Sequence, residues 1–285
     1  MNVPLNIDLK GKTAVVTGGG GVLCGAFSEA LGKCGAKVAV LDLRKDAADK
    51  VANKIKASGG IAMGIEANVL RLTSLLEAEE IISEEFGPCN ILINGAGGNH
   101  PKGTTSNEFL TVEDLESKEE GVKTFFDLDL EGFKFVFDLN LIGTLLPTQV
   151  FAKKMIDQKG AVIINISSMN AFLPLTKIPA YSGAKAAVSN FTKWLAVHFS
   201  RVGIRVNAIA PGFFLTDQNR HLLMEDDGSY TLRADRIISQ TPLQRFGKPE
   251  DLLGTLLWLV DEQASGFVNG IVVPVDGGFS AYSGV

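Results

Sequence analysis

Short apolar segments rich in β-branched residues alternate with longer amphipathic segments along almost the whole chain. The short segments predict strands and the longer ones predict helices, an alternation typical of βαβ units whose parallel sheet is covered on both faces. Strands are expected at 13–17, 37–41, 61–67, 90–93, 161–167, 205–210 and 271–275. Helices are expected at 26–33, 45–57, 72–86, 132–156, 181–200 and 249–259. The pattern therefore predicts one doubly wound α/β domain over residues 1–285, with a seven-stranded parallel sheet.

Two polar segments interrupt this alternation. Residues 98–132 contain a charged run at 113–120 and form a longer connection than is usual in an α/β unit. Residues 213–240 follow the sixth predicted strand. Both leave the carboxyl ends of strands, where open α/β sheets bind ligands. We therefore expect an insertion at 98–132 and a substrate lid at 213–240, with surface elaboration as the alternative for each.

The composition is that of a globular protein, with 46% hydrophobic and 21% charged residues. A formal net charge of -5 disfavours nucleic acid and anionic membranes as partners and favours a small-molecule substrate. The three cysteines and three histidines show no CxxC or HxxxH spacing, which argues against a metal site and a disulfide framework. The chain lacks a signal-peptide pattern and an apolar run near the roughly 18 residues of a membrane span, so a cytoplasmic location is expected.

A surplus of glycine indicates a cofactor site. The chain has 31 glycines, where an average composition gives about 20. Gly18 to Gly21 lie between the first strand and its helix, where the backbone can approach a pyrophosphate at a helix N-terminus. Asp42 ends the second strand at a spacing that suits hydrogen bonds to an adenosine ribose. Because this carboxylate repels a 2′-phosphate, NAD is favoured over NADP, with Arg44 the one nearby cation that opposes this preference.

A second group of residues suits acid–base chemistry. Tyr181 and Lys185 are spaced i, i+4, which places a phenol and an ammonium on one face of a helix. Ser168 lies at the carboxyl end of the fifth strand, thirteen residues before Tyr181. Its hydroxyl is therefore expected to face the start of the helix that carries Tyr181.

These motifs together resemble the short-chain dehydrogenase/reductase family over nearly the whole chain. The family's motifs are similar to five segments: the glycine loop from Thr17, the NNAG motif at 94–97, the helix asparagine Asn140, the YxxxK motif at 181–185 and the PGxxxT motif at 211–216. The resemblance implies a Rossmann-type fold and four catalytic residues: Asn140, Ser168, Tyr181 and Lys185. It implies that NAD is bound by residues from the same motifs: Gly18, Gly20, Gly21, Val22, Leu23, Asp42, Leu43, Asn68, Val69, Asn94, Gly95, Ala96, Tyr181, Lys185, Pro211, Gly212, Phe214 and Thr216.

Four positions depart from the family pattern. Val22 and Cys24 stand where the second and third glycines of the family's loop fall, so the phosphate turn is expected to be built from 18–21 by a different backbone path. Gly95 replaces the second asparagine of NNAG, and Asn68 replaces the acidic residue usual after the third strand. Asn68 can still hydrogen-bond an adenine edge, and none of these changes removes a catalytic group.

The expected chemistry follows from the residue types. Ketone reduction delivers hydride to carbon and a proton to oxygen, so Tyr181 is expected to act as general acid, and as general base in the reverse direction. A free phenol has a pKa near 10, and Lys185 with the charge of the oxidised nicotinamide is expected to lower the pKa of Tyr181 to near 7. By resemblance, four residues hold other groups: Ser168 the substrate oxygen, Asn140 a water, Lys185 the nicotinamide ribose and Thr216 the carboxamide.

Three segments, 97–102, 123–129 and 211–220, are similar to the D-mannonate oxidoreductase (fructuronate reductase) branch of the family. That branch interconverts D-mannonate and D-fructuronate with NAD. A sugar acid needs a cation and side chains that donate and accept hydrogen bonds, and Arg220 is the first candidate for its carboxylate because a guanidinium pairs bidentately. The substrate contacts expected are His100, Lys102, Asn170, Asn219 and Arg220.

Other activities stay open at this stage. Another polyol or gluconate-type dehydrogenase, or a 3-oxoacyl reductase, would use the same catalytic residues. A non-catalytic nucleotide-sensing protein would keep the fold without the chemistry. The resemblance also implies a homotetramer in which helices around Asn140 and Tyr181 pair between subunits.

Overall fold

The seven predicted strands all form, and they pair in parallel in the order β3-β2-β1-β4-β5-β6-β7. The computed structural model describes residues 7–116, 121–216 and 219–284. Each strand lies within one residue of its expected ends: β1 Thr13–Thr17, β2 Lys37–Asp42, β3 Ile61–Glu66, β4 Ile91–Asn94, β5 Val162–Ile166, β6 Arg205–Pro211 and β7 Val272–Val275. The strand order reverses between β1 and β4, which makes this point the expected binding crevice of a doubly wound sheet.

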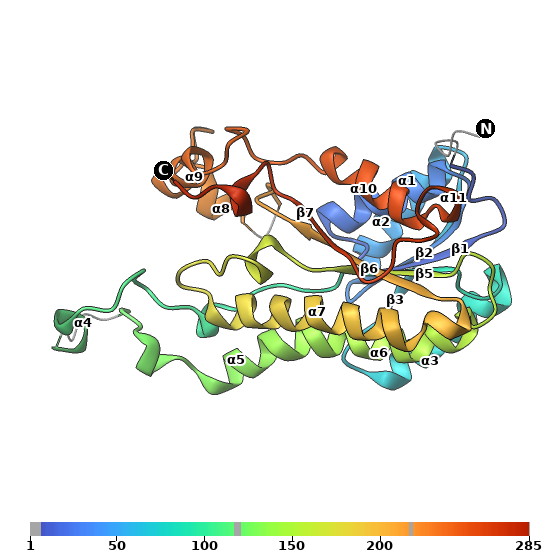
Figure 1. Ribbon diagram of the computed structural model, residues 1–285, viewed down its shortest axis with the longest axis horizontal. Coiled ribbons are helices and arrows are strands. Elements are labelled where there is room, and N and C mark those ends of the chain that lie inside the picture. The colour runs from blue at the N-terminus through green and yellow to red at the C-terminus, as the bar shows by residue number, and fades with distance from the viewer. Residues whose placement is uncertain (1–6, 117–120, 217–218, 285) are drawn as a thin grey trace.

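Helices cover both faces of the sheet, which gives three layers (Figure 1). One layer consists of α1 (Val22–Lys33), α2 (Lys45–Ala57) and α10 (Glu250–Val260), with the short α11 (Glu262–Ser265) after it. The opposite layer consists of α3 (Leu72–Phe86), α5 (Leu130–Phe137), α6 (Gly143–Met155) and α7 (Pro179–His198). Neighbouring residues of β1 point to opposite faces of the sheet. Val16 belongs to the hydrophobic cluster under the first helical layer, and Val15 belongs to the cluster under the second.

The helix expected at 132–156 starts earlier and is interrupted. α5 is followed by a π-helical turn at Asp138–Ile142, and α6 begins directly after that turn. The expected helix is therefore present as one continuous helical segment, Leu130–Met155, but the sequence pattern did not predict its π turn. Asn140 lies within the turn and is fully buried. π turns of this kind occur frequently at functional sites.

The combined segment Leu130–Met155 is long and apolar enough to cross a membrane by length and composition alone, since its most apolar 18-residue window has a mean hydropathy of 1.4. The expectation that no segment reaches this threshold is therefore wrong. Half of the most apolar window is buried inside the molecule, where α6 packs against α3 and β4. A helix that packs on a sheet in the core of an α/β fold is apolar for that reason.

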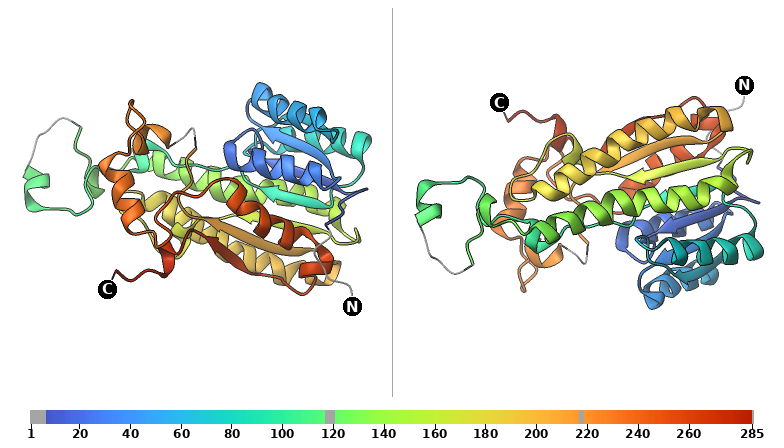
Figure 2. Two further views of the ribbon diagram at one scale, coloured as in Figure 1. Left: turned by 90° about the horizontal axis from the view of Figure 1, so that it is seen from above. Right: turned by 90° about the horizontal axis from the view of Figure 1, so that it is seen from below.

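The two segments that interrupt the strand–helix pattern lie at the same end of the molecule (Figure 1). The first contains the short helical turns Pro101–Gly103 and Phe125–Asp127 and helix α4 (Val112–Glu116), and part of it projects from the body (Figure 2). The second contains α8 (Arg220–Leu223) and α9 (Leu232–Ser239), which enclose a small apolar core of Leu223, Ala234 and Ile237. Residues 217–218, within the expected lid, lie outside the described residues.

Candidate active site

The turn between β1 and α1 is built from glycines because larger residues do not fit. Gly18 has φ +62°, and a Cβ on Gly20 would lie 2.6 Å from the Cβ of Ala47. Helix α1 begins at Val22 after Gly21, and no side chain caps its first N–H groups. These N–H groups and the positive end of the helix dipole are suited to a pyrophosphate, so the turn fits a dinucleotide.

Asp42 closes the same turn from the end of β2. Its carboxylate accepts hydrogen bonds from the N–H of Gly20 at 3.1 Å and from the N–H of Arg44 at 3.0 Å. The carboxylate and the glycine turn therefore hold each other in place. The ends of β2 and β3 are adjacent, and they bring three further predicted cofactor residues to this edge: Leu43, Asn68 and Val69.

Two of the departures from the family pattern explain one another. Cys24, in the first turn of α1, is buried, and a Cβ on Gly95 would overlap its Sγ atom. A cysteine where the family has glycine therefore requires a glycine where the family has asparagine. Burial raises the pKa of the Cys24 thiol to about 12, so the thiol is neutral. Its effect on position 95 is steric. The sequence shows both replacements, but only the structure shows that they touch.

The turn after β4 is tied to the end of β1 by Thr17. Its hydroxyl accepts hydrogen bonds from the N–H groups of the two residues that follow Asn94, at 3.1 and 3.3 Å. The side chain of Asn94 itself points into the interior, where its Nδ2 donates to Thr148 Oγ1 at 3.0 Å and to Asn165 Oδ1 at 2.9 Å. The side-chain amide of Asn94 therefore links β4 to β5 and α6, and its expected cofactor contact stays a prediction.

Asn140 connects the π turn to the loop after β4. Its Nδ2 donates to the carbonyl oxygens of Val136 at 2.7 Å and Gly98 at 2.8 Å, and its Oδ1 accepts from the N–H of Gly98 at 3.3 Å. A Cβ on Gly97 would lie 2.7 Å from Asn140 Oδ1 and 3.2 Å from Lys185 Nζ. The structure thus brings Asn140 and Lys185 to the same glycine.

Lys185 is a buried cation beside Tyr181. Its Nζ donates to the carbonyl oxygen of Ile166 at 2.7 Å and lies 5.6 Å from the centre of the Tyr181 ring. Burial lowers the pKa of Lys185 to about 8. The ammonium is therefore charged at pH 7 and loses its proton as the pH rises through about 8.

The pKa of Tyr181 in the protein without its cofactor is set by burial and by Ser168. Burial raises the pKa of the phenol, and the hydroxyl of Ser168 lowers it by less. The expected lowering of the pKa to near 7 requires the charge of the oxidised nicotinamide as well as Lys185, and it stays a prediction. The phenol is protonated at neutral pH, which is the form that can donate a proton.

Ser168 and Asn170 follow β5 at the helical turn Met169–Ala171, which packs against α7. Ser168 Oγ accepts a hydrogen bond from the N–H of Asn170 at 3.3 Å. Asn170 is 4% exposed as a residue, but its amide atoms are not among the buried polar atoms without a partner in the described residues, which are Asn94 Oδ1 and Ser182 Oγ.

The start of the insertion lies against the N-terminal end of α7. A Cβ on Gly103 would lie 3.3 Å from the Cβ of Ala180, the residue before the predicted catalytic tyrosine. His100 Nδ1 accepts a hydrogen bond from the N–H of Lys102 at 3.2 Å, and its ring packs edge-on against Phe135 at 5.3 Å. The neutral His100 ring therefore carries its proton on Nε2, which can donate to a substrate. The side chain of Lys102 is exposed.

The segment after β6 carries the remaining predicted residues. Asn219 Oδ1 accepts from the N–H of Thr216 at 2.8 Å, and its Nδ2 donates to the carbonyl oxygen of Phe214 at 2.8 Å. The amide of Asn219 therefore closes the turn that carries Thr216, and its expected substrate contact stays a prediction. Arg220 begins α8, and no carboxylate of the described residues pairs with its guanidinium.

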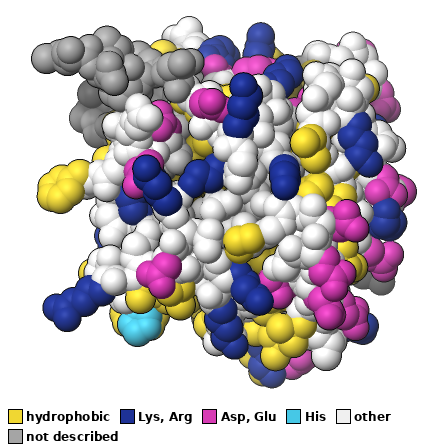
Figure 3. Space-filling model, turned by 90° about the vertical axis from the view of Figure 1, so that its right-hand side faces the viewer, with side chains coloured by type: hydrophobic (Ala, Val, Ile, Leu, Met, Phe, Trp, Pro, Cys, Tyr) yellow, Lys and Arg dark blue, Asp and Glu magenta, His cyan; other side chains and the backbone are white. Residues whose placement is uncertain are grey.

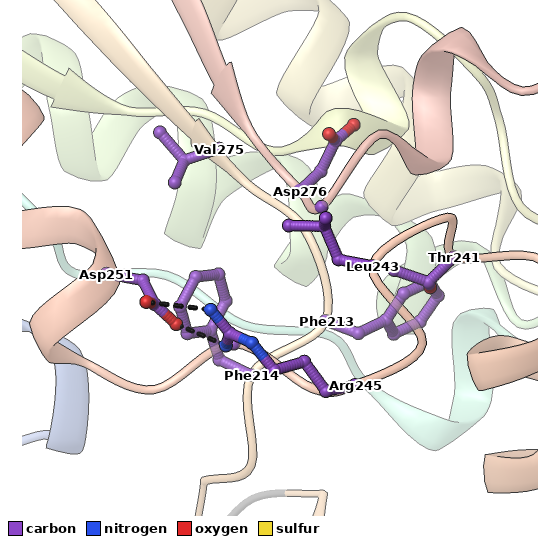
Figure 4. Close-up of a pocket in the computed structure, with 10 residues that line it drawn as sticks. Phe213, Phe214, Thr241, Leu243, Arg245, Asp251, Val275 and Asp276 are labelled. Atoms are coloured by element: carbon purple, nitrogen blue, oxygen red, sulfur yellow. Dashed lines mark hydrogen bonds and ion pairs between the residues drawn. The ribbon is translucent and has the colours of Figure 1, made fainter.

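A cavity of about 150 Å³ lies behind Phe213 and Phe214 (Figure 4). The guanidinium of Arg245 borders it and donates to both carboxylate oxygens of Asp251, at 2.6 and 3.0 Å. This ion pair lowers the pKa of Asp251 to about 2. The cavity is lined from β7, the segment after β6 and the loop before α10, whereas the predicted catalytic residues lie elsewhere. Of the predicted site residues, the cavity is bordered by Phe214 alone among its lining residues.

Comparison with known proteins finds many relatives of this chain, and they belong to one family. The pattern of the short chain dehydrogenase family matches residues 12–227. An uncharacterised oxidoreductase of Haemophilus influenzae is 58% identical over 285 residues, which cover 100% of this chain and 99% of that protein. The uncharacterised oxidoreductase UxuB of Bacillus subtilis is 54% identical over 283 residues, which cover 99% of this chain and 100% of that protein.

A solved structure shows the same similarity in three dimensions. It is a crystal structure from Haemophilus influenzae with bound NAD, provisionally named as a D-mannonate oxidoreductase. It superposes with a TM-score of 0.93 at 58% sequence identity and covers 100% of both chains. The similarity therefore extends over the insertion and the segment after β6 as well as the sheet.

Proposed function

Since this chain belongs to the short-chain dehydrogenase family, we propose that it is an NAD-dependent oxidoreductase acting on a sugar acid, with D-mannonate and D-fructuronate as the substrate pair. One observation supports the proposal most directly. The Lys185 ammonium lies beside the Tyr181 ring, and both Lys185 and Asn140 lie against Gly97 in the loop after β4. The similar Haemophilus structure, with its bound NAD and its provisional name, supports the cofactor and the substrate class.

The chain offers a complete set of groups for NAD. The N–H groups at the start of α1 would hold the pyrophosphate, and Asp42 the adenosine ribose. Lys185 would hold the nicotinamide ribose, and Thr216 the carboxamide. When bound, the nicotinamide supplies or accepts the hydride.

The protein's own residues would then transfer the proton and bind the substrate oxygen. In ketone reduction, the carbonyl carbon gains the hydride, and Tyr181 gives its phenolic proton to the oxygen. Ser168 donates a hydrogen bond to the same oxygen as its charge develops. The Lys185 ammonium favours the phenolate left behind, and Asn140 lies beside it where a water would link it to solvent. In alcohol oxidation the same groups act in reverse.

The substrate's polar groups match the residues around this centre. Asn170, whose backbone N–H donates to Ser168 Oγ, would bond a hydroxyl next to the reacting carbon. His100 would donate from Nε2 at the N-terminal end of α7. Arg220 is the proposed carboxylate partner because its guanidinium can pair bidentately, with Lys102 at the rim.

Purified protein with NADH and D-fructuronate is expected to consume NADH, and with NAD and D-mannonate to produce it. The test is NADH absorbance over a panel that includes gluconate, other polyols and a 3-oxoacyl substrate. Better turnover of another panel member would make that compound class the function. NADH binding without turnover of any member would identify a nucleotide-sensing protein.

Asp42→Ala is expected to shift the ratio of kcat/KM for NADH over NADPH by about tenfold or more toward NADPH. The carboxylate's repulsion of a 2′-phosphate is lost, and a loss of about 1.4 kcal/mol is a tenfold change. Both cofactors are expected to bind less tightly, because the N–H of Gly20 loses its acceptor. Asp46→Ala, an exposed acid in the first turn of α2, is the matched control. An unchanged ratio in Asp42→Ala would exclude this role.

The proposed assembly is a homotetramer that pairs the helices around Asn140 and Tyr181 between subunits, and the proposed location is the cytoplasm. Family resemblance supports the tetramer. Sedimentation velocity of the purified chain tests it.

A further inference from the structure

One ion pair joins the two segments that interrupt the strand–helix pattern. Glu108 Oε1, in the insertion, lies 3.1 Å from Arg236 Nη1 of α9. The insertion follows β4, and α8 and α9 follow β6, with β5 between these strands in the sheet. Figure 1 shows α8 and α9 on the side of α10 and the insertion on the side of α5. The ion pair therefore connects the two sides of the sheet end at which Ser168 follows β5.

The insertion is fixed to the start of α7, the helix that carries Tyr181. The N–H of Thr105 donates to the carbonyl oxygen of Lys177 at 2.9 Å, four residues before Tyr181. Lys177 has φ +71°, a conformation that residues with a side chain rarely adopt, and the bond from Thr105 helps to hold it. Glu108 is three residues beyond Thr105 in the chain. The insertion thus carries Glu108 at a place that is set by the helix of Tyr181.

Helices α8 and α9 are held to the body by few buried side chains. Their shared core consists of Leu223, Ala234 and Ile237, and it reaches the body at Phe246. Leu232, at the start of α9, is 83% exposed. A segment with few buried apolar contacts moves at a low free-energy cost. The position of α8 and α9 therefore depends on contacts at their edges, and the ion pair with the insertion is one of these contacts.

A displacement of these two helices would change the predicted substrate site. Arg220, the proposed partner of the substrate carboxylate, is the first residue of α8. Helix α8 packs on α9 through their shared core. Arg220 therefore moves with α9, and the ion pair of Arg236 limits the distance between Arg220 and the helix of Tyr181.

The other ion pairs of the described residues are local. They join near neighbours in one helix, two packed helices, or a loop and the helix after it. Basic and acidic side chains also mix over the end of the molecule opposite to α8 and α9, which Figure 3 shows. Exposed ion pairs of these kinds contribute little to stability. The pair of Glu108 with Arg236 differs because it joins two separate segments on either side of a predicted site.

We propose that Glu108 and Arg236 are positioning residues, whose ion pair holds α8 and α9 in the place where Arg220 binds the substrate carboxylate. Neither residue is assigned a contact with the substrate or the cofactor. Their side chains are 38% and 71% exposed, so the pair can form and break without the cost of burying a charge. The proposal rests on the proposed function, because it takes the substrate to be a sugar acid that Arg220 holds.

A charge-reversal cycle tests the positioning role. Glu108→Arg or Arg236→Glu is expected to raise KM for D-fructuronate by about fivefold or more and to change kcat by less than about twofold, because it weakens substrate binding and leaves the reacting groups in place. Both changes in one chain are expected to return KM to within about twofold of the unmodified enzyme, because the reversed charges attract again. The dissociation constant for NADH is expected to stay within about twofold in every variant.

Limited digestion with chymotrypsin gives a second measurement that does not depend on the substrate. Leu222, Tyr230 and Leu232 are exposed side chains of residues 219–240 at which chymotrypsin can cut. Cleavage within 219–240, followed by mass spectrometry, is expected to be about threefold faster or more in each single reversal, because α8 and α9 are then held less firmly. The doubly changed chain is expected to be cut at the rate of the unmodified protein.

Lys54→Glu is the matched control for both measurements. It breaks an exposed ion pair in which Lys54 of α2 lies 3.3 Å from Glu29 of α1, in the layer formed by α1, α2 and α10. KM for D-fructuronate and the cleavage rate are expected to be those of the unmodified protein.

Three outcomes would overturn the proposal. They are an unchanged KM in both single reversals, a loss that the doubly changed chain does not recover, and equal cleavage rates in the unmodified and reversed chains. Failure of the proposed function is distinguished from these outcomes. If the unmodified protein turns over another acid of the panel, KM for that acid is measured instead. If it turns over none, the cleavage rates alone decide whether the ion pair positions α8 and α9.

Discussion

Tyr181→Phe is expected to lower kcat for the sugar-acid reaction by about 10³-fold, since a positioned proton donor contributes roughly 10²–10⁴-fold. The ring and its contacts with α5 remain, so the affinity for NADH is expected to stay within about threefold of the unmodified enzyme. The measurements are steady-state turnover with D-fructuronate and an NADH fluorescence titration. Tyr282→Phe, which removes a half-exposed phenol near the C-terminus, is the matched control and is expected to keep full activity. If the Tyr181→Phe enzyme keeps its activity, a group other than Tyr181 donates the proton to the substrate oxygen.

The pH dependence of the same reaction follows from the burial of the catalytic pair. Burial raises the pKa of Tyr181, so the phenol stays protonated across neutral pH. Burial lowers the pKa of Lys185 to about 8, so its positive charge is lost as the pH rises through that value. Ketone reduction is therefore expected to decline above about pH 8, because phenolate is no longer stabilised by a neighbouring cation. A constant rate up to pH 9.5 would show that the Lys185 charge is not required.

Gly95→Ala is expected to raise the dissociation constant for NADH at least tenfold and to lower the free energy of unfolding by about 1–3 kcal/mol, the usual cost of overpacking. The new Cβ would overlap Cys24 Sγ and come within 2.9 Å of the carbonyl oxygen of Thr17. Relief requires movement of α1 or of the turn after β4, both of which border the predicted cofactor groove. The measurements are NADH fluorescence titration and urea unfolding.

Cys24→Ala in the same chain is expected to recover most of the loss. It removes the Sγ atom and leaves two Cβ atoms about 3.5 Å apart, which is ordinary van der Waals contact. Recovery is expected to be incomplete, because the contact with the Thr17 carbonyl remains. Gly254→Ala, in α10 with open space around it, is the matched control and is expected to be neutral or slightly stabilising. If the double variant binds NADH no better than Gly95→Ala alone, the two positions are not a matched pair.

The residue pattern predicted the strands and most of the helices closely, because strand and helix signals in a parallel α/β fold are local. The apolar strand 13–17 and the glycines after it specify a buried strand and a tight turn wherever they occur. Asp42 is predictable for the same reason, since a strand end and a fixed spacing place its carboxylate near the glycine turn. The order of Ser168, Tyr181 and Lys185 on a strand end and one helix face is likewise visible in one dimension.

The sequence pattern did not predict the direction of side chains whose partners are distant in the chain or lie in an irregular loop. Asn94 bonds Thr148 and Asn165, which are 54 and 71 residues away, so no local pattern could direct its amide inward. Asn219 has near neighbours as partners, but a loop without repeating structure leaves its direction open until the turn has formed. The π turn at Asn140 has the same cause, because the helix widens to satisfy contacts with the loop after β4.

The sequence by itself therefore determined a doubly wound sheet, a dinucleotide turn closed by a carboxylate, and a tyrosine–lysine pair on one face of a helix. Only the tertiary structure decided that Cys24 fills the space a side chain at position 95 would need, that burial raises the pKa of Tyr181 while lowering that of Lys185, and that α4 projects from the body. The division has a physical reason. Periodicity and turn chemistry act between near neighbours in the chain, whereas packing, desolvation and electrostatic environment depend on which distant residues the fold brings together.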